Sequence, residues 1–342
     1  MNTKRWTIAE LDEAAKVLRM NGLVAFPTET VYGLGANAFA SSAVKRVFEV
    51  KGRPSDNPLI IHVTSFEEIK KYVIDLHPLA QSLVDNYWPG PLTLICKVKK
   101  GVFAPEVSAG LSTVSFRMPD NEATLALLKK AGVPAVGPSA NTSGKPSPTS
   151  YEHVFHDLNG KIEGILDDGS TKIGVESTVL DISKADQTPM ILRPGAITKE
   201  RIKKDLDIEV VYDRHLLKES ETPKAPGMKY KHYSPNTKVL MVKQNDWAAA
   251  LTWIKENNIR AGILAGPTTC DRMRFDTAAV YSYSDDSVEA ATKGLFAGLR
   301  ALDASQLQLD VILAATFAEQ NLGLAYMNRL KKAAAQNYFK AE

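Results

Sequence analysis

Over the first 212 residues, segments whose apolar residues have helical spacing alternate with short apolar runs of strand length. Helical spacing runs over 8–18, where Thr7 and Glu10 form a capping box and Asn21-Gly22 ends the segment. The alternation of the two patterns predicts an α/β fold. Further helical patterns lie at 43–48, 65–87 and 122–131, and runs of strand length lie at 23–25, 59–63, 92–95, 113–118, 133–136 and 179–182.

The strand predicted at 113–118 alternates strictly between apolar and polar residues. Val114 and Phe116 therefore face the core, whereas Thr113 and Arg117 share the polar face. An arginine on a half-buried sheet face needs an anionic partner. Two interpretations of Arg117 stay open at this point: a salt bridge within the protein, or a contact with the carboxylate or phosphate of a ligand.

Both periodicities fail over 213–236, where several prolines interrupt any regular element. We interpret this stretch as a linker between a domain at 1–212 and a smaller α/β domain at 237–342. Aromatic and basic residues at 226–233 could fold back over a nucleotide, or they could form a structured hinge. In the smaller domain, strands are predicted at 239–242, 261–264 and 311–313, and helices at 247–256, 288–302 and 324–335.

Length, charge and cysteine content narrow the class of protein. A chain of 342 residues is long enough for two domains of typical size. A net charge of +3, from 42 basic and 39 acidic residues, gives no overall footprint for nucleic acid, so any polyanion that is bound should be small. Cys96 and Cys270 lack metal-ligand spacing, and we interpret both as buried apolar residues. With no apolar signal core or membrane-spanning run, we expect a soluble, cytoplasmic protein without membrane contact.

Two common catalytic chemistries have no signature in the sequence. His153 and His156 share a helical face without further ligands nearby, so surface histidines are favoured over a metal site. The G-x-S-x-G elbow of serine hydrolases is also absent.

The stretch FPTETVYGLGANA, residues 26–38, is the first candidate for a site. Three polar side chains follow a strand end, and Gly33 and Gly35 would let the backbone approach a ligand. A tight turn with positive-φ glycines is the plainer interpretation. The same glycines fit the dinucleotide pattern G-x-G-x-x-A, but TETVY separates them from the strand and the expected acidic residue falls on Asp56 in a polar loop.

The loop at 137–148 is the second candidate, because it is rich in small hydroxyl side chains. It departs from the Walker pattern, which would require Gly at Ser139 and Ser or Thr at Pro146. Hydroxyl, amide and backbone donors after a strand can still hold an anion. A solvated Ser/Pro loop is the alternative.

Taken together, eight ordered motifs closely resemble the two-domain form of the YrdC-like family, the L-threonylcarbamoyl-adenylate synthases. The motifs are FPTETVYGLGANA, KGRPSDNPLIIHV, YWPGPLTLI, STVSFRMPD, GPSANTSGKPSPT, GVESTVL, LRPGAIT and APGMKYKHYSP. The resemblance covers nearly the whole chain. It implies a twisted open mixed sheet with a concave basic cavity, followed by a linker and a smaller Rossmann-like α/β domain.

The resemblance also implies an activity. L-Threonine, bicarbonate and ATP would be joined into threonylcarbamoyl-AMP with release of pyrophosphate, a nucleotidyl transfer. Partner proteins would then place the threonylcarbamoyl group on adenosine 37 of tRNAs that read codons beginning with A. Magnesium would accompany the ATP, the linker would close over the site as a lid, and weak RNA binding is possible.

Residues are carried over from the family position by position. The threonine site would consist of Thr28, His62, Arg117 and Ser177. The ATP site would consist of Lys51, Arg53, Asn57, Thr113, Ser139, Asn141, Ser147, Arg193 and Tyr230, with Lys51 and Arg53 also acting in catalysis and no protein ligand for a metal.

Two other classes of function stay open at this stage. A double-stranded RNA or tRNA-binding module without catalysis would use the same basic cavity. A nucleotide-dependent oxidoreductase would rest only on the G-x-G-x-x-A match.

Overall fold

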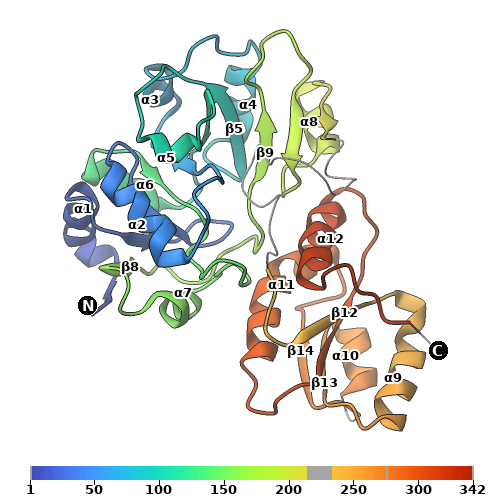
Figure 1. Ribbon diagram of the computed structural model, residues 1–342. Coiled ribbons are helices and arrows are strands. Elements are labelled where there is room, and N and C mark those ends of the chain that lie inside the picture. The colour runs from blue at the N-terminus through green and yellow to red at the C-terminus, as the bar shows by residue number, and fades with distance from the viewer. Residues whose placement is uncertain (1, 214–232, 275, 341–342) are drawn as a thin grey trace. The chain divides into compact units, whose positions relative to one another are not determined.

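The computed structural model describes residues 2–213, 233–274 and 276–340, which form two compact units (Figure 1). The first unit takes up the chain to residue 213 except for 144–147 and 173–175, which group with the second unit. Most of the predicted linker, including Tyr230, lies outside the described residues.

The described part of the first unit is built on an 11-stranded twisted sheet that mixes parallel and antiparallel neighbours. For example, β4 and β6 are parallel, whereas β5 and β6 are antiparallel. The predicted mixed sheet is therefore confirmed. In their order across the sheet the strands are β1 (Lys4–Trp6), β8 (Gly164–Leu166), β2 (Val24–Phe26), β3 (Gly33–Asn37), β7 (Ala135–Val136), β4 (Ile60–His62), β6 (Thr113–Arg117), β5 (Leu92–Lys97), β9 (Thr178–Asp181), β10 (Met190–Arg193) and β11 (Val211–Tyr212).

The central strands bury side chains on both faces of the sheet. Ile61 and Phe116 belong to the largest apolar cluster, while Ile60 packs in a smaller cluster on the other face. Because side chains alternate along a strand, His62 and Arg117 lie on the same face as Ile60. The predicted alternation of 113–118 is thus confirmed, and it directs Arg117 away from the main core.

Each helix that the apolar spacing predicts in the first unit is present, although one is divided in two, and the helices at 105–108 and 199–206 were not predicted. The capping box at Thr7 is present, since the Glu10 carboxylate accepts from the Thr7 backbone N–H at 2.9 Å. The helix predicted over 65–87 is divided in two, because Val73 pairs with Val98 in an isolated β-bridge and Pro78 follows. The helices are η1 (Ile8–Glu10), α1 (Leu11–Arg19), α2 (Ser41–Lys51), α3 (Phe66–Lys70), α4 (Ala80–Tyr87), α5 (Pro105–Ser108), α6 (Glu122–Ala131), α7 (Tyr151–Leu158) and α8 (Lys199–Leu206).

The glycines at 33 and 35 have a different role from those predicted. They lie inside strand β3 and have no positive φ, so the turn and the dinucleotide loop are both wrong for them. A Cβ built on Gly35 would lie 2.7 Å from the Val24 carbonyl oxygen and 2.8 Å from the Phe26 ring. The glycines therefore leave room for Phe26 to lie across the sheet. The approach of a ligand to this backbone stays a prediction.

The second unit contains a four-stranded parallel sheet with strand order β12-β15-β13-β14. Its parallel strands alternate with helices, so the predicted Rossmann-like α/β arrangement is confirmed. The strand β14 and the helix α10 were not predicted. The elements are β12 (Lys238–Val242), η3 (Gln244–Asp246), α9 (Trp247–Glu256), β13 (Ala261–Ala265), α10 (Pro267–Met273), β14 (Ala279–Ser282), α11 (Val288–Asp303), β15 (Val311–Ala315) and α12 (Leu322–Ala333).

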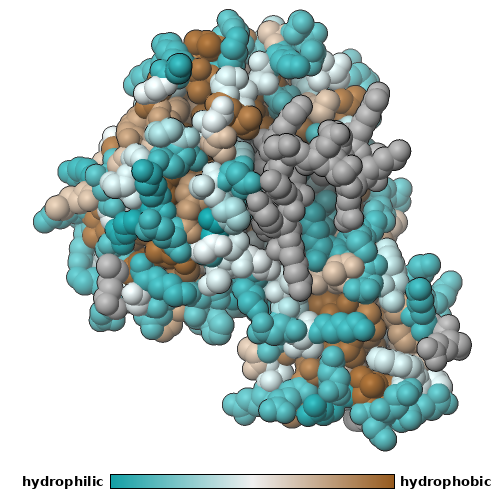
Figure 2. Space-filling model, viewed as in Figure 1, coloured by the Kyte–Doolittle hydropathy of each residue, from teal (hydrophilic) through white to brown (hydrophobic). Residues whose placement is uncertain are grey.

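The two cysteines are buried, and the visible surface is mainly hydrophilic. Cys96 and Cys270 are free thiols, and both are buried as predicted. On the face shown in Figure 2, hydrophilic residues predominate and apolar residues are exposed in patches between them. Among the described helices, we find none with the length and apolar character required to span a bilayer.

Candidate active site

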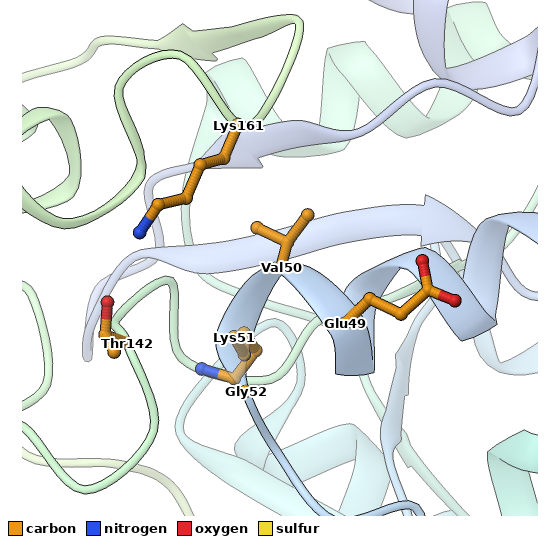
Figure 3. Close-up of a pocket in the computed structure, with 6 residues that line it drawn as sticks. All are labelled: Glu49, Val50, Lys51, Gly52, Thr142 and Lys161. Atoms are coloured by element: carbon orange, nitrogen blue, oxygen red, sulfur yellow. The ribbon is translucent and has the colours of Figure 1, made fainter.

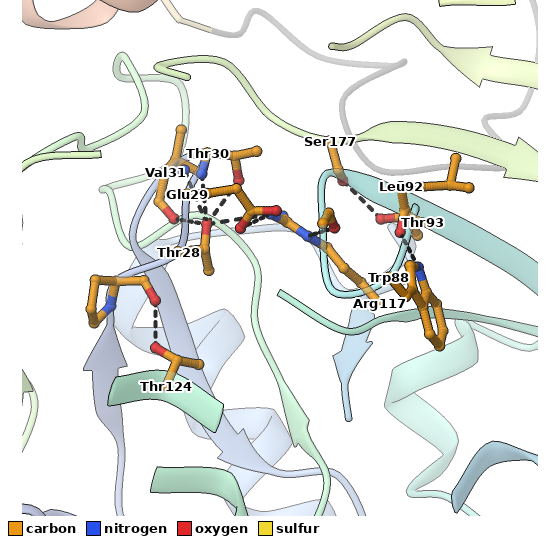
Figure 4. Close-up of polar contacts among 12 residues, drawn as sticks. Thr28, Glu29, Thr30, Val31, Trp88, Leu92, Thr93, Arg117, Thr124 and Ser177 are labelled. Carbon is orange, nitrogen blue, oxygen red and sulfur yellow. Dashed lines mark hydrogen bonds and ion pairs between the residues drawn. The ribbon is translucent and has the colours of Figure 1, made fainter. Parts of the chain in front are cut away.

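Polar side chains gather beside the central strands, where the turn after β2 meets the sheet face formed by β4 and β6 (Figure 4). His62 and Arg117 are directly paired at the ends of their two parallel strands. The turn brings Thr28 and Glu29 to the same place, and all four side chains are buried. The structure therefore brings together three residues predicted for the threonine site.

Thr28 fixes the shape of this turn through its hydroxyl group. The Thr28 Oγ1 accepts from the backbone N–H of Thr30 at 3.1 Å and of Val31 at 3.2 Å, and it donates to the Val31 carbonyl at 2.7 Å. Such local hydrogen bonds are typical of a hydroxyl-stabilised turn. They hold the backbone of residues 28–31 in one conformation against the sheet.

Arg117 is anchored on three sides. Its Nη2 atom lies 2.7 Å from Glu29 Oε2, forming a buried ion pair, and donates to Thr28 Oγ1 at 3.5 Å. Its Nε donates to the Gly90 carbonyl at 3.3 Å. Of the two interpretations left open by the sequence, the internal salt bridge is present. A contact between Arg117 and a ligand carboxylate stays a prediction.

His62 is neutral in this environment. Complete burial and the positive charge of Arg117 hold the pKa of His62 well below its ordinary value. Its ring meets Phe26 edge-on, with 5.2 Å between ring centroids, and Nδ1 has no hydrogen-bond partner among the described residues. A neutral imidazole with an unused nitrogen can donate or accept one hydrogen bond from a ligand.

A second buried group connects two more predicted residues at the same sheet. The Ser177 and Thr93 hydroxyls are 2.7 Å apart, and Ser177 precedes β9 while Thr93 lies in β5 (Figure 4). Arg193, at the end of β10, donates from Nε to the Ser177 carbonyl and from Nη2 to its hydroxyl, both at 3.0 Å. Ser177 and Arg193 are thus brought together, as threonine-site and ATP-site candidates respectively.

Lys51 holds the loop at 137–148. It is the last residue of α2, and its buried Nζ donates to the carbonyl oxygens of Ser139 at 2.5 Å and Asn141 at 2.6 Å. The predicted ATP-site residues Lys51, Ser139 and Asn141 therefore form one structural group. A pocket of about 540 Å³ lies at this end of α2, lined by Glu49, Val50, Lys51, Gly52, Thr142 and Lys161 (Figure 3).

Arg53 and Asn57 form a third group in the loop after α2. Arg53 Nη2 donates to the carbonyl oxygens of Asn57 and Pro58, each at 3.4 Å. The side chain of Asn57 is buried, yet neither its Nδ2 nor its Oδ1 has a hydrogen-bond partner among the described residues. Buried amides are almost always satisfied, by protein, water or ligand. The predicted contact between Asn57 and ATP stays a prediction.

The remaining predicted residues are spread more widely. Thr113 is half-buried at the start of β6, four positions along the same face from Arg117. Ser147 is buried and groups with the second unit, whereas Tyr230 lies outside the described residues.

Two residues of the site were not assigned a role from the sequence. Glu29 was noted only as part of a polar trio, and Thr93 appeared within an apolar run. Their partners, Arg117 and Ser177, are distant in the chain. The polar face of the strand 113–118 indicated that Arg117 needs an anion, but periodicity does not identify which one.

Two family profiles match the chain. The Sua5/YciO/YrdC profile, described as telomere recombination, covers residues 16–195. A profile described as the C-terminal domain of threonylcarbamoyl-AMP synthase covers residues 197–335.

Curated relatives and a solved structure match over almost the full length. The threonylcarbamoyl-AMP synthases of Bacillus subtilis and Pyrococcus abyssi are 45% and 44% identical to this chain; the alignments cover 98% and 96% of it, and 98% and 94% of the relatives. The crystal structure of P. abyssi Sua5 complexed with L-threonine matches with a TM-score of 0.90 and 41% identity, over 99% of this chain and 100% of that one.

The fold and the site define a two-unit α/β protein with a buried polar site on the face of a mixed sheet. The profile matches and the full-length relatives identify it further: the chain belongs to the Sua5/YciO/YrdC family, in the form that carries a C-terminal domain. The resemblance inferred from the eight motifs is confirmed.

Proposed function

We propose that this protein is a threonylcarbamoyl-AMP synthase, which forms threonylcarbamoyl-AMP and pyrophosphate from L-threonine, bicarbonate and ATP. The observation that carries the proposal is its likeness, over nearly the full length, to enzymes of this name and to P. abyssi Sua5, whose crystal structure contains L-threonine. The buried group formed by Thr28, His62 and Arg117 supports an amino-acid site on the sheet face. The reaction class is nucleotidyl transfer.

In this proposal the threonine lies against β4 and β6. Arg117 binds the α-carboxylate, because a guanidinium can donate two parallel hydrogen bonds to a carboxylate. The unused Nδ1 of neutral His62 offers one hydrogen bond to a polar group of the same substrate. Ser177 completes this side, where Arg193 and Thr93 fix its hydroxyl.

ATP occupies the groups around α2 and the loop at 137–148. Lys51 holds that loop in shape, and its charge with that of Arg53 favours the triphosphate. Asn57 gains the hydrogen bonds that it lacks within the described chain. Thr113, Ser139, Asn141, Ser147, Arg193 and Tyr230 are proposed as the other ATP contacts.

The reaction then proceeds in two steps. The unprotonated amine of threonine adds to the carbon of bicarbonate, and loss of water leaves a carbamate. A carbamate oxygen attacks the α-phosphorus of ATP, and pyrophosphate leaves from the opposite side. Negative charge gathers in both steps, so positioning and cationic groups supply most of the catalysis.

Magnesium, partners and location complete the proposal. Among the described residues there is no group of three or more His, Cys, Asp or Glu side chains that could hold a metal ion. We propose that magnesium arrives with ATP and neutralises its phosphates. We further propose that the product passes, in the cytoplasm, to the proteins that modify tRNA; weak RNA binding would be detected as a salt-dependent affinity.

The test is a reaction with labelled bicarbonate. The purified full-length protein is incubated with ATP, magnesium, L-threonine and labelled bicarbonate. We expect a labelled adenylate and pyrophosphate, both of which require threonine. Pyrophosphate release that ignores threonine, or RNA binding without turnover, would contradict the proposal.

A further inference from the structure

Glu29 is the most unusual charged residue of the site. Its side chain is 3% exposed, and among the described residues it is paired with the Arg117 guanidinium at 2.7 Å. The contact is an ion pair without an aligned hydrogen bond, since neither Oε1 nor Oε2 has a hydrogen-bond partner among the described residues. A buried carboxylate normally requires several hydrogen bonds to offset its desolvation. Glu29 therefore has unused acceptor capacity inside the site.

The backbone keeps this carboxylate in place. The Glu29 carbonyl accepts from the Lys172 N–H at 3.1 Å, and the hydroxyl of Thr28 ties the same turn to Thr30 and Val31. The turn thus presents the acid at a fixed position beside Arg117 (Figure 4).

The charges of the site match those of a free amino acid. An amino acid at neutral pH carries an α-carboxylate and an α-ammonium group on adjacent atoms. Arg117 alone would attract the first and repel the second. Two neighbours of Arg117 cannot balance the ammonium charge, because His62 is neutral and the Thr28 hydroxyl already donates to Val31.

We propose that Glu29 binds the α-ammonium group of the amino-acid substrate, while Arg117 binds its α-carboxylate. The inference rests on the proposed function, since it takes threonine as the substrate. Glu29 is then a specificity-determining residue, which selects an α-amino acid over the corresponding α-hydroxy acid. It also holds the nitrogen atom that forms the carbamate.

Two ligands separate this role from a purely structural one. Titration calorimetry measures the binding of L-threonine and of 2,3-dihydroxybutanoate, in which a hydroxyl replaces the α-amino group. A charged hydrogen bond changes affinity by about 10- to 100-fold. We expect the wild-type protein to prefer threonine by at least about tenfold. Glu29→Gln should lose that preference by weakening threonine binding, with the affinity for the hydroxy acid unchanged or increased.

Other outcomes overturn the inference. If Glu29→Gln loses affinity equally for both ligands, Glu29 acts only by orienting Arg117. If both affinities are unchanged, Glu29 has no role in binding the substrate. Glu106→Gln is the matched control, because this carboxylate is paired with Ser41 and Lys45, and its helix α5 packs through Val107 in the main apolar cluster, on the sheet face opposite Arg117. Its two affinities should equal those of the wild type.

Thermal melting checks that Glu29→Gln is folded. If the variant is unfolded, the two affinities of the wild-type protein test the inference. Equal affinities for threonine and the hydroxy acid would exclude an acceptor for the ammonium group. The labelled-bicarbonate assay on the wild type is run in parallel. If the wild type makes the adenylate but Glu29→Gln still prefers threonine over the hydroxy acid as the wild type does, only this inference is refuted. If the wild type makes no adenylate, the proposed function is refuted.

Discussion

At the scale of single residues, the site combines charged and neutral groups whose states are set by burial. His62 stays neutral because it is fully buried beside Arg117, so its pKa lies well below the ordinary value. In the unfolded chain the same histidine titrates near its ordinary pKa of 6.5. As the pH falls through that value, the unfolded state gains a proton that the folded state does not, and the folded protein loses stability.

His62 should therefore contribute to acid sensitivity. Between about pH 7.5 and about pH 5.5 its share of the loss in unfolding free energy is about 1 kcal/mol. We expect His62→Asn to lose less stability than the wild type over this interval, measured by urea denaturation at both pH values. His156→Gln is the control, because that side chain is 79% exposed. An identical pH dependence in His62→Asn and the wild type would contradict the assignment of a neutral buried histidine.

Replacing Asn57 should affect ATP binding without destabilising the fold. Its buried amide has no hydrogen-bond partner among the described residues, and a buried amide that stays unsatisfied costs about 1–3 kcal/mol of stability. Asn57→Leu should thus leave the melting temperature of the free protein unchanged or raised, while weakening ATP binding by about tenfold or more.

Melting curves and ATP titration, each with the exposed Asn86→Leu as control, test this directly. A lower melting temperature combined with normal ATP affinity would mean that Asn57 is structural.

At the scale of elements, α2 and the loop segment at 139–143 are joined by several hydrogen bonds. Lys51 connects them through two carbonyl oxygens, and the backbone N–H of Ser143 donates back to the Lys51 carbonyl at 2.8 Å. Lys51→Met keeps the length of the side chain but removes the ammonium group. We expect ATP affinity to fall more than about tenfold and adenylate formation to fall by orders of magnitude, with threonine affinity nearly unchanged.

The matched control is Lys45→Met, on the exposed side of the same helix, where the ammonium pairs with Glu106 at 3.5 Å. It should bind ATP like the wild type. If both variants retain wild-type ATP affinity, Lys51 has no part in shaping the nucleotide site.

The elements also show what the sequence can predict. Apolar runs identified the central strands, because strands buried on both faces are continuously apolar. The apolar runs did not identify β3, because Gly33 and Gly35 have low strand propensity. Glycine is required at these two positions because the Phe26 ring lies over them. The alternation in β6 placed Arg117 on the polar face. Its partner Glu29 comes from a distant turn, and no local pattern contains that information.

At the scale of the whole molecule, the second unit should be an independent domain. Its four described strands pair only with one another in the order β12-β15-β13-β14, and they enclose their own apolar cluster. A chain of about 100 residues with a closed core is a typical domain size. We therefore expect a fragment of residues 237–342 to fold alone, with a cooperative thermal transition and dispersed amide signals in an NMR spectrum.

A longer fragment that starts at residue 197, where the C-terminal family profile begins, makes the boundary testable. It adds α8 and β11, and β11 pairs with β10 of the first unit. Without β10, this strand has no partner, and an unpaired edge strand remains disordered or promotes aggregation. We expect the longer fragment to show the same folded signals plus sharp signals from residues 197–213, or to be less soluble. If only the longer fragment folds, the domain begins earlier than the sequence predicts, and α8 or β11 is part of its core.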